Sequence, residues 1–234
     1  MVKMKRIVYT TLLFAFCFST FADEKMLSLC EDQAHSFGDG RGKSKIQATC
    51  INAYKTAAGQ TAIKKSSDGL MTVFGHRNII FIERPDKASG IRTDVLAGQS
   101  TTLEAATALS IDEKNNEIAV LEKSGDILFF SSQITGNVAP YRVIKSQDLY
   151  GSTELAVDSI NDQIIVVNNS KNSILFYSRL ANVYAREEKK NLKLLKAIKD
   201  TSGSLSDLNV DLKNQEFSVT DQISKKIITY KLIK

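Results

Sequence analysis

The stretch Leu109-Ser-Ile-Asp-Glu-Lys-Asn115 decides the fold, because it returns twice further along the chain. Leu155-Ala-Val-Asp-Ser-Ile-Asn161 and Leu208-Asn-Val-Asp-Leu-Lys-Asn214 share with it the pattern Leu-x-Ile/Val-Asp-x-x-Asn. The aspartates of the three copies lie 46 and then 53 residues apart. Self-similarity at such a period is typical of repeat architectures.

The apolar stretches that follow each copy repeat as well. The next strand is predicted at Glu117–Val120, Gln163–Val166 and Glu216–Val219, and another about ten residues later at Ile127–Phe130, Ile174–Tyr177 and Ile227–Tyr230. An earlier copy lacks the aspartate but keeps two strands, Leu70–Val73 and Ile79–Ile82. Four short strands in about 45 residues match one propeller blade. We therefore predict a mostly β fold, a β-propeller-like array of about four four-stranded blades at residues 60–98, 106–146, 153–198 and 206–234.

The repeated polar residues fall at the turn between the first and second strand of each unit. They are Asp112, Asn115, Asp158, Asn161, Asp211 and Asn214. Asp and Asn favour such turns because their side chains bond nearby backbone amides and tolerate left-handed geometry. We expect this structural role for all six, and the alternative is a ring of carboxylates around the propeller axis.

The sequence alone does not decide whether the array closes into a ring. The last unit ends after its third strand, and Thr61–Lys65 fits either the inner strand of the first unit or the missing strand of the last. An open array would expose strand edges, which proteins normally cover. A closed four-bladed ring is our first expectation, and a homodimer of open arcs is the second.

The first 22 residues are typical of a secretory signal peptide. Lys3, Lys5 and Arg6 precede an apolar run that is too short to span a bilayer, and Thr20-Phe-Ala22 suits a cleavage site. Cleavage predicts a periplasmic or secreted protein with no membrane span. Residues 23–59 are predicted to form a helical hairpin, and Cys30 and Cys50, the two cysteines that remain, most simply form a disulfide.

Charge argues against a nucleic-acid partner. The chain holds 31 basic and 26 acidic residues. Removing the three basic residues of the leader leaves 28 against 26, a net charge of +2. So small an excess does not build the basic field that nucleic-acid binding requires.

Several of these stretches resemble the blade repeats of bacterial propellers of the NHL-like, six-bladed superfamily. The resemblance rests on Leu155–Asp158, Ile164–Asn168, Ser173–Tyr177 and Gly136–Ile144, and it covers about residues 68–234. It implies the architecture, but function does not follow from fold. Lactonases of the regucalcin and gluconolactonase kind are similar in fold and hold one divalent ion with Glu, Asn and Asp. That likeness makes Glu154, Asn168 and Asp207 candidate ligands for calcium, whose preferred ligands are oxygens.

The expected function is therefore binding rather than catalysis. No nucleophile elbow and no His-x-x-x-His pair occurs in the sequence. We predict an exported, non-catalytic scaffold without a cofactor, which engages a protein or cell-envelope component through a propeller surface. The alternative is a divalent-metal-dependent lactonase or related hydrolase with a site at the propeller axis.

Overall fold

A computed structural model describes residues 64–66, 69, 71–76, 78–88, 90–180, 194–199 and 204–232. In these residues each helical element is a three-residue 3-10 turn, at Gln99–Thr101, Gln147–Leu149 and Asn169–Lys171. The prediction of a mostly β chain is confirmed for this part. The predicted hairpin at residues 23–59 and the predicted Cys30–Cys50 disulfide lie outside the described residues.

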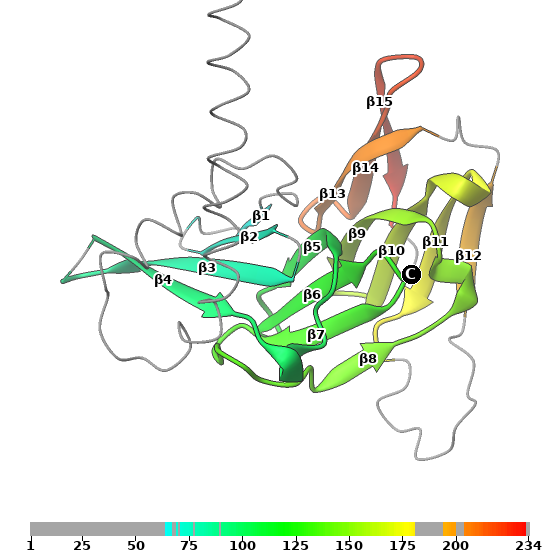
Figure 1. Ribbon diagram of the computed structural model, residues 1–234. Helices are drawn as coiled ribbons and strands as arrows, with labels where there is room; N and C mark the ends of the chain where they lie inside the picture. The colour runs from blue at the N-terminus through cyan, green and yellow to red at the C-terminus, as the bar shows by residue number, and fades with distance from the viewer. Residues whose placement is uncertain are drawn as a thin grey trace, which may run out of the picture.

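The strands form four antiparallel sheets that follow one another along the chain (Figure 1). The first sheet contains β1 (Lys64–Lys65), β2 (Thr72–His76), β3 (Ile79–Asp86) and β4 (Gly90–Leu96). The second contains β5 (Ala106–Asp112), β6 (Glu117–Glu122), β7 (Ile127–Ser131) and β8 (Arg142–Ile144). The third contains β9 (Ser152–Asp158), β10 (Gln163–Asn168), β11 (Ser173–Ser178) and β12 (Leu194–Lys199). The fourth contains β13 (Leu205–Asp211), β14 (Glu216–Asp221) and β15 (Lys226–Lys231).

The two ends of the array differ in how they are completed. Lys64 and Lys65 pair with Val73 and Thr72, so β1 is the inner strand of the first sheet. Of the two alternatives for Thr61–Lys65, the structure places Lys64 and Lys65 in the first sheet. The fourth sheet has three strands in the described part of the chain, with β15 at its edge.

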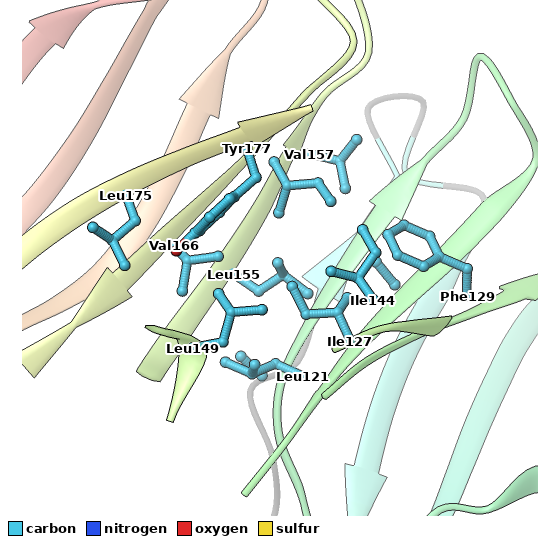
Figure 2. Packing of buried hydrophobic residues seen from close by; sticks show 13 residues of the cluster. Leu121, Ile127, Phe129, Ile144, Leu149, Leu155, Val157, Val166, Leu175 and Tyr177 are labelled. Atoms are coloured by element: carbon cyan, nitrogen blue, oxygen red, sulfur yellow. The ribbon is translucent and has the colours of Figure 1, made fainter. Parts of the chain in front are cut away.

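Hydrophobic clusters join each sheet to the next. The cluster between the second and third sheets includes Leu121, Ile127, Phe129 and Ile144 on one side and Leu155, Val157, Val166 and Tyr177 on the other (Figure 2). Similar clusters lie between the first and second sheets and between the third and fourth. Burying one such side chain stabilises the fold by about 1.5–3 kcal/mol.

The sequence of each middle strand reflects its neighbours. β6 and β10 are buried along their whole length, because each lies in a sheet with another sheet on both faces. Their continuous apolar runs suit that position. In β14 burial alternates, with Phe217 and Val219 facing the third sheet and Ser218 and Thr220 on the other face. The fourth sheet therefore ends the array with a polar face.

Candidate functional site

The three Asp-x-x-Asn turns share one set of hydrogen bonds. In the turn after β5, Asp112 accepts from the Asn115 backbone N–H at 3.1 Å and from its Nδ2 at 2.7 Å. The turn after β9 repeats both bonds between Asp158 and Asn161, at 3.1 and 2.6 Å. The turn after β13 repeats them between Asp211 and Asn214, at 2.9 and 2.7 Å. Each carboxylate thus binds the amide groups of its own turn.

The residue after each asparagine is left-handed and closes the turn against the end of the third strand. These residues have φ near +50° and their carbonyls accept a backbone N–H at 2.8–2.9 Å; the pairs are Asn116 with Ser132, Asp162 with Arg179, and Gln215 with Leu232. The repeat is thus visible in backbone geometry as well as in sequence.

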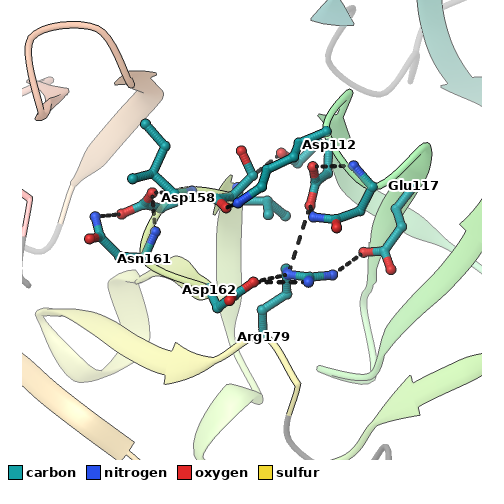
Figure 3. Close-up of polar contacts among 12 residues, drawn as sticks. Asp112, Glu117, Asp158, Asn161, Asp162 and Arg179 are labelled. Atoms are coloured by element: carbon teal, nitrogen blue, oxygen red, sulfur yellow. Dashed lines mark hydrogen bonds and ion pairs between the residues drawn. The ribbon is translucent and has the colours of Figure 1, made fainter.

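A largely buried group of charges, which we call the arginine cluster, links the second and third sheets; Figure 3 labels its members Asp112, Glu117, Asp162 and Arg179. It consists of Asp112, Glu117, Arg142, Asp162 and Arg179. Glu117 Oε2 accepts from Arg179 Nη1 at 2.9 Å and from Arg142 Nη2 at 3.1 Å. Arg179 also binds Asp162 Oδ1 at 2.9 Å and lies 3.8 Å from Asp112 Oδ2. Arg142 Nη1 donates to the Arg179 carbonyl, so both arginines bridge the same two sheets.

The centre of the arginine cluster is almost closed to solvent, while Asp162 lies at its edge with a half-exposed side chain. Glu117, Arg142 and Arg179 are each less than a tenth exposed, and the Arg142 guanidinium lies 3.3 Å from the centre of the Phe129 ring. Burial lowers the pKa of Arg142, which Glu117 partly offsets. Burial also acts to lower the pKa of Arg179, but Asp162 and Glu117 raise it overall. The cluster is a structural bridge in which each charge has an opposite charge beside it.

Three large, exposed apolar side chains lie close to members of this cluster in the sequence. Tyr141 precedes Arg142 and is 56% exposed, Leu180 follows Arg179 and is 40% exposed, and Ile160 lies in the Asp158–Asp162 turn and is 51% exposed. Burial and the Glu117 carboxylate raise the pKa of the Tyr141 phenol, which places that phenol beside the cluster. We call the surface formed by these three residues the turn face.

A cavity of about 560 Å³ lies between the first strands of all four sheets. Its lining includes Lys64 of β1, Ser110 of β5, Ala156 of β9 and Asn209 of β13. Val157 N–H donates to Ser110 Oγ at 3.0 Å, and Lys64 Nζ donates to the Leu208 carbonyl at 3.3 Å. The second bond connects the first sheet with the fourth across the cavity.

The three candidate metal ligands do not converge. Glu154 and Asp207 influence each other: burial raises the pKa of Glu154, the Lys64 charge lowers it, and the Asp207 charge raises it. The Asn168 side chain is fully buried and bonded elsewhere. Its Nδ2 donates to the carbonyls of Asp148 at 3.0 Å and Tyr150 at 2.9 Å, and its Oδ1 accepts from Lys171 N–H at 3.1 Å. The described residues contain no group of three or more His, Cys, Asp or Glu side chains able to hold a metal ion.

The arginine cluster was missed in the sequence because its members come from separate strands. Arg142 opens an outer strand and Arg179 follows a third strand 37 residues later. The repeat does relate two of these contacts: Arg179 and Ser132 occupy the same place in their units, and their carbonyls accept from Arg142 and Arg84, each an arginine of the preceding sheet.

The part of the chain that the structure describes holds no helix with the length and apolar character of a membrane span.

Comparison with known proteins gives similarity in structure alone. No protein-family profile and no curated protein sequence matches the chain. Among solved structures, the chain is similar to the WD40 β-propeller domain of Doa1, with a TM-score of 0.49 and 14% identity, over 76% of this chain and 58% of that one. It is similar to U3-55K with a TM-score of 0.49 and 12% identity, over 74% of this chain and 52% of that one. The chain therefore spans somewhat more than half the length of these two proteins.

Proposed function

We propose that the protein is an exported, non-catalytic binding protein whose four sheets are the blades of a β-propeller-like array. Consecutive antiparallel sheets, each packed on the next, support that architecture. The cavity between the four first strands supports a curved array, and the bond from Lys64 to the Leu208 carbonyl connects its two ends on the inner side. The described hydrophobic clusters join consecutive sheets only, so the outer face of the fourth sheet has no neighbouring sheet among the described residues.

The turn face carries the proposal of binding. Tyr141, Ile160 and Leu180 expose apolar surface within two residues of Arg142, Asp162 and Arg179, although a folded chain gains stability by burying such side chains. The polar groups beneath them are committed to structural bonds, since Glu117 holds two arginines and Asp162 holds one. A surface of exposed apolar side chains on a fixed base suits a protein or cell-envelope partner.

The test compares capture of envelope proteins by the wild-type chain and by surface variants. Tyr141→Ser, Ile160→Ser and Leu180→Ser combined should abolish capture of a defined partner, identified by crosslinking to the wild type. Tyr150→Ser with Ile91→Ser is the matched control, because both side chains are exposed and lie outside the turn face. Equal capture by the triple variant and the wild type would contradict the proposal.

The hydrolase alternative has its own discriminating measurement. A thermal melt in EDTA and then in calcium should give the same Tm if no cation site exists. A ligand at a hundred times its Kd stabilises a fold by about 2.7 kcal/mol, which moves Tm by several degrees in a chain of this size. A calcium-dependent rise that Asp207→Asn removes would favour the metal site over a purely binding role.

A further inference from the structure

The fourth sheet ends at β15 in the described part of the chain. The second and third sheets each have one more strand at the equivalent edge. β7 pairs with β8, and β11 pairs with β12, whereas β15 pairs only with β14 among the described strands. Ile127, Ile174 and Ile227 occupy the same place in the repeat. The first two are fully buried, and Ile227 is 73% exposed. Ile127 is buried because it packs toward the next sheet, whereas the face of β15 that carries Ile227 has no such neighbour among the described sheets. The pairing of the strands shows that β15 forms the edge of its sheet in the described part of the chain.

The direction of the backbone groups of β15 follows from one hydrogen bond. Leu232 N–H donates to the Gln215 carbonyl at 2.9 Å, so it points toward β14. Backbone groups alternate sides along a strand, so the N–H and C=O groups of Ile227, Thr229 and Lys231 point to the free edge. In the second sheet the equivalent carbonyl, that of Phe129, accepts from Tyr141 N–H at 3.1 Å as the chain enters β8. The free edge of β15 thus presents the bonding groups that receive the fourth strand elsewhere.

The side chains along this edge are basic, and they favour an acidic strand as its partner. Residues 225–231 contain Lys225, Lys226 and Lys231 and no acidic residue. Lys231 already binds Glu216 at 2.6 Å, but Lys225 and Lys226 are exposed and have no ion pair among the described residues. Ile228 and Tyr230 are half-buried on the face toward the third sheet, and Tyr230 stacks on Phe217 at 5.0 Å. An added strand would extend that apolar face and meet the lysines at one end.

We propose that the free edge of β15 binds an extended acidic segment of another protein, which completes the fourth sheet as its outer strand. Strand addition of this kind takes its affinity from main-chain hydrogen bonds and its specificity from alternating side chains. A second copy of this chain fits poorly, because two β15 edges side by side would bring six lysines and no acid into one seam. The chain's own Lys64 and Lys65 are already paired in the first sheet. The proposal is independent of the turn face.

The test measures binding of designed peptides to the full chain by fluorescence anisotropy. The probe is an extended peptide as long as β15, six residues, with alternating valine and threonine and two added aspartates at each end. The matched probe has lysines in place of the aspartates. We expect saturable binding of the acidic peptide, at least tenfold tighter than that of the lysine peptide.

Two kinds of variant locate the binding at the edge. Thr229→Pro removes one outward N–H without removing a bond to β14, and should weaken binding at least tenfold, while Thr229→Val should leave it unchanged. Lys225→Glu with Lys226→Glu should reverse the preference between the two peptides, and it tests the proposal even if Thr229→Pro does not fold. Failure of the acidic peptide to bind, equal binding of both peptides, or no effect of either variant would overturn the proposal. A dimer in sedimentation equilibrium that Thr229→Pro dissociates would also overturn it, in favour of a second copy. None of these results depends on Tyr141, Ile160 or Leu180, so the turn face can fail while the edge holds.

Discussion

Replacing Glu117 with alanine should destabilise the protein severely, because Glu117 is the shared ion partner of two buried arginines. After the substitution Arg179 keeps Asp162 at 2.9 Å. Arg142 keeps the Arg179 carbonyl, the Phe129 ring and the Tyr141 phenol, which are uncharged, so one guanidinium remains buried without an opposite charge. Removing one partner of a buried ion pair typically costs about 3–5 kcal/mol. For a chain of this size that corresponds to a fall in Tm of roughly 6–20 °C.

The repeat supplies the matched control for this prediction. Glu216 opens β14 as Glu117 opens β6, but its partner Lys231 is 75% exposed at the side chain. A surface ion pair contributes about 0–1 kcal/mol, so Glu216→Ala should lower Tm by no more than about 4 °C. Thermal melts followed by circular dichroism measure both variants. Adding Arg142→Leu to Glu117→Ala should recover part of the loss, because it removes the uncompensated charge.

Two results would refute the reasoning. Equal falls in Tm for Glu117→Ala and Glu216→Ala would show that burial does not distinguish the two sites. A fall below about 2 °C for Glu117→Ala would show that the arginine cluster does not hold the second and third sheets together.

Three further predictions concern single sites. Asp158→Ala should lower the free energy of unfolding by about 2–3 kcal/mol, because the buried Asp158 carboxylate accepts from two backbone N–H groups and from Asn161 Nδ2. Asp211 is exposed, so Asp211→Ala should lower it clearly less in the same urea titration. Gly125→Ala should lower Tm far more than Gly90→Ala. Both glycines have positive φ, but only at Gly125 would the new Cβ lie 2.8 Å from the Leu149–Tyr150 backbone. Similar falls in Tm for the two variants would contradict this reasoning. Burial raises the pKa of Glu122 in the folded protein above its value in the unfolded chain. The contribution of Glu122 to stability is therefore fully present at a pH below the unfolded pKa, and it is lost as the pH rises through the folded pKa. Glu122→Gln should therefore raise Tm at pH 7 and not at pH 3, and a gain that is the same at both pH values would count against burial of the charge as its cause.

Local patterns in the sequence predicted the strands and turns of the last three sheets well. Alternation and the Asp-x-x-Asn copies mark β5, β6, β9, β10, β13 and β14, because hydrogen bonds within a turn depend only on residues a few positions apart. The left-handed residues after the turns were harder to predict. Asn116 and Asp162 tolerate that geometry, but Gln215 has no such preference and adopts it because the Leu232 N–H closes the turn.

Long-range partners could not be predicted in the same way. Glu117, Arg142 and Arg179 meet only after two sheets have packed, and no spacing in the sequence encodes that meeting. The same holds for Asn168. The likeness to lactonases made it a candidate calcium ligand, but its amide oxygen accepts from the 3-10 turn that follows and its amide nitrogen donates to the Asp148–Tyr150 segment. The sequence shows which side chains can bind a ligand, but packing determines whether their polar atoms are already occupied by other parts of the chain.

The hydrophobic clusters have a consequence for how the protein opens. Each cluster in the described part of the chain draws on two adjacent sheets, so stability is a sum of nearest-neighbour terms rather than one global quantity. Amides of β14 and β15, covered on one side alone, should exchange with solvent through local fraying that leaves the interface of the second and third sheets shut. A partner on the turn face would slow exchange in the middle of the array, and a strand on β15 would slow it at the end. The two regions could then be tightened or loosened separately within one chain.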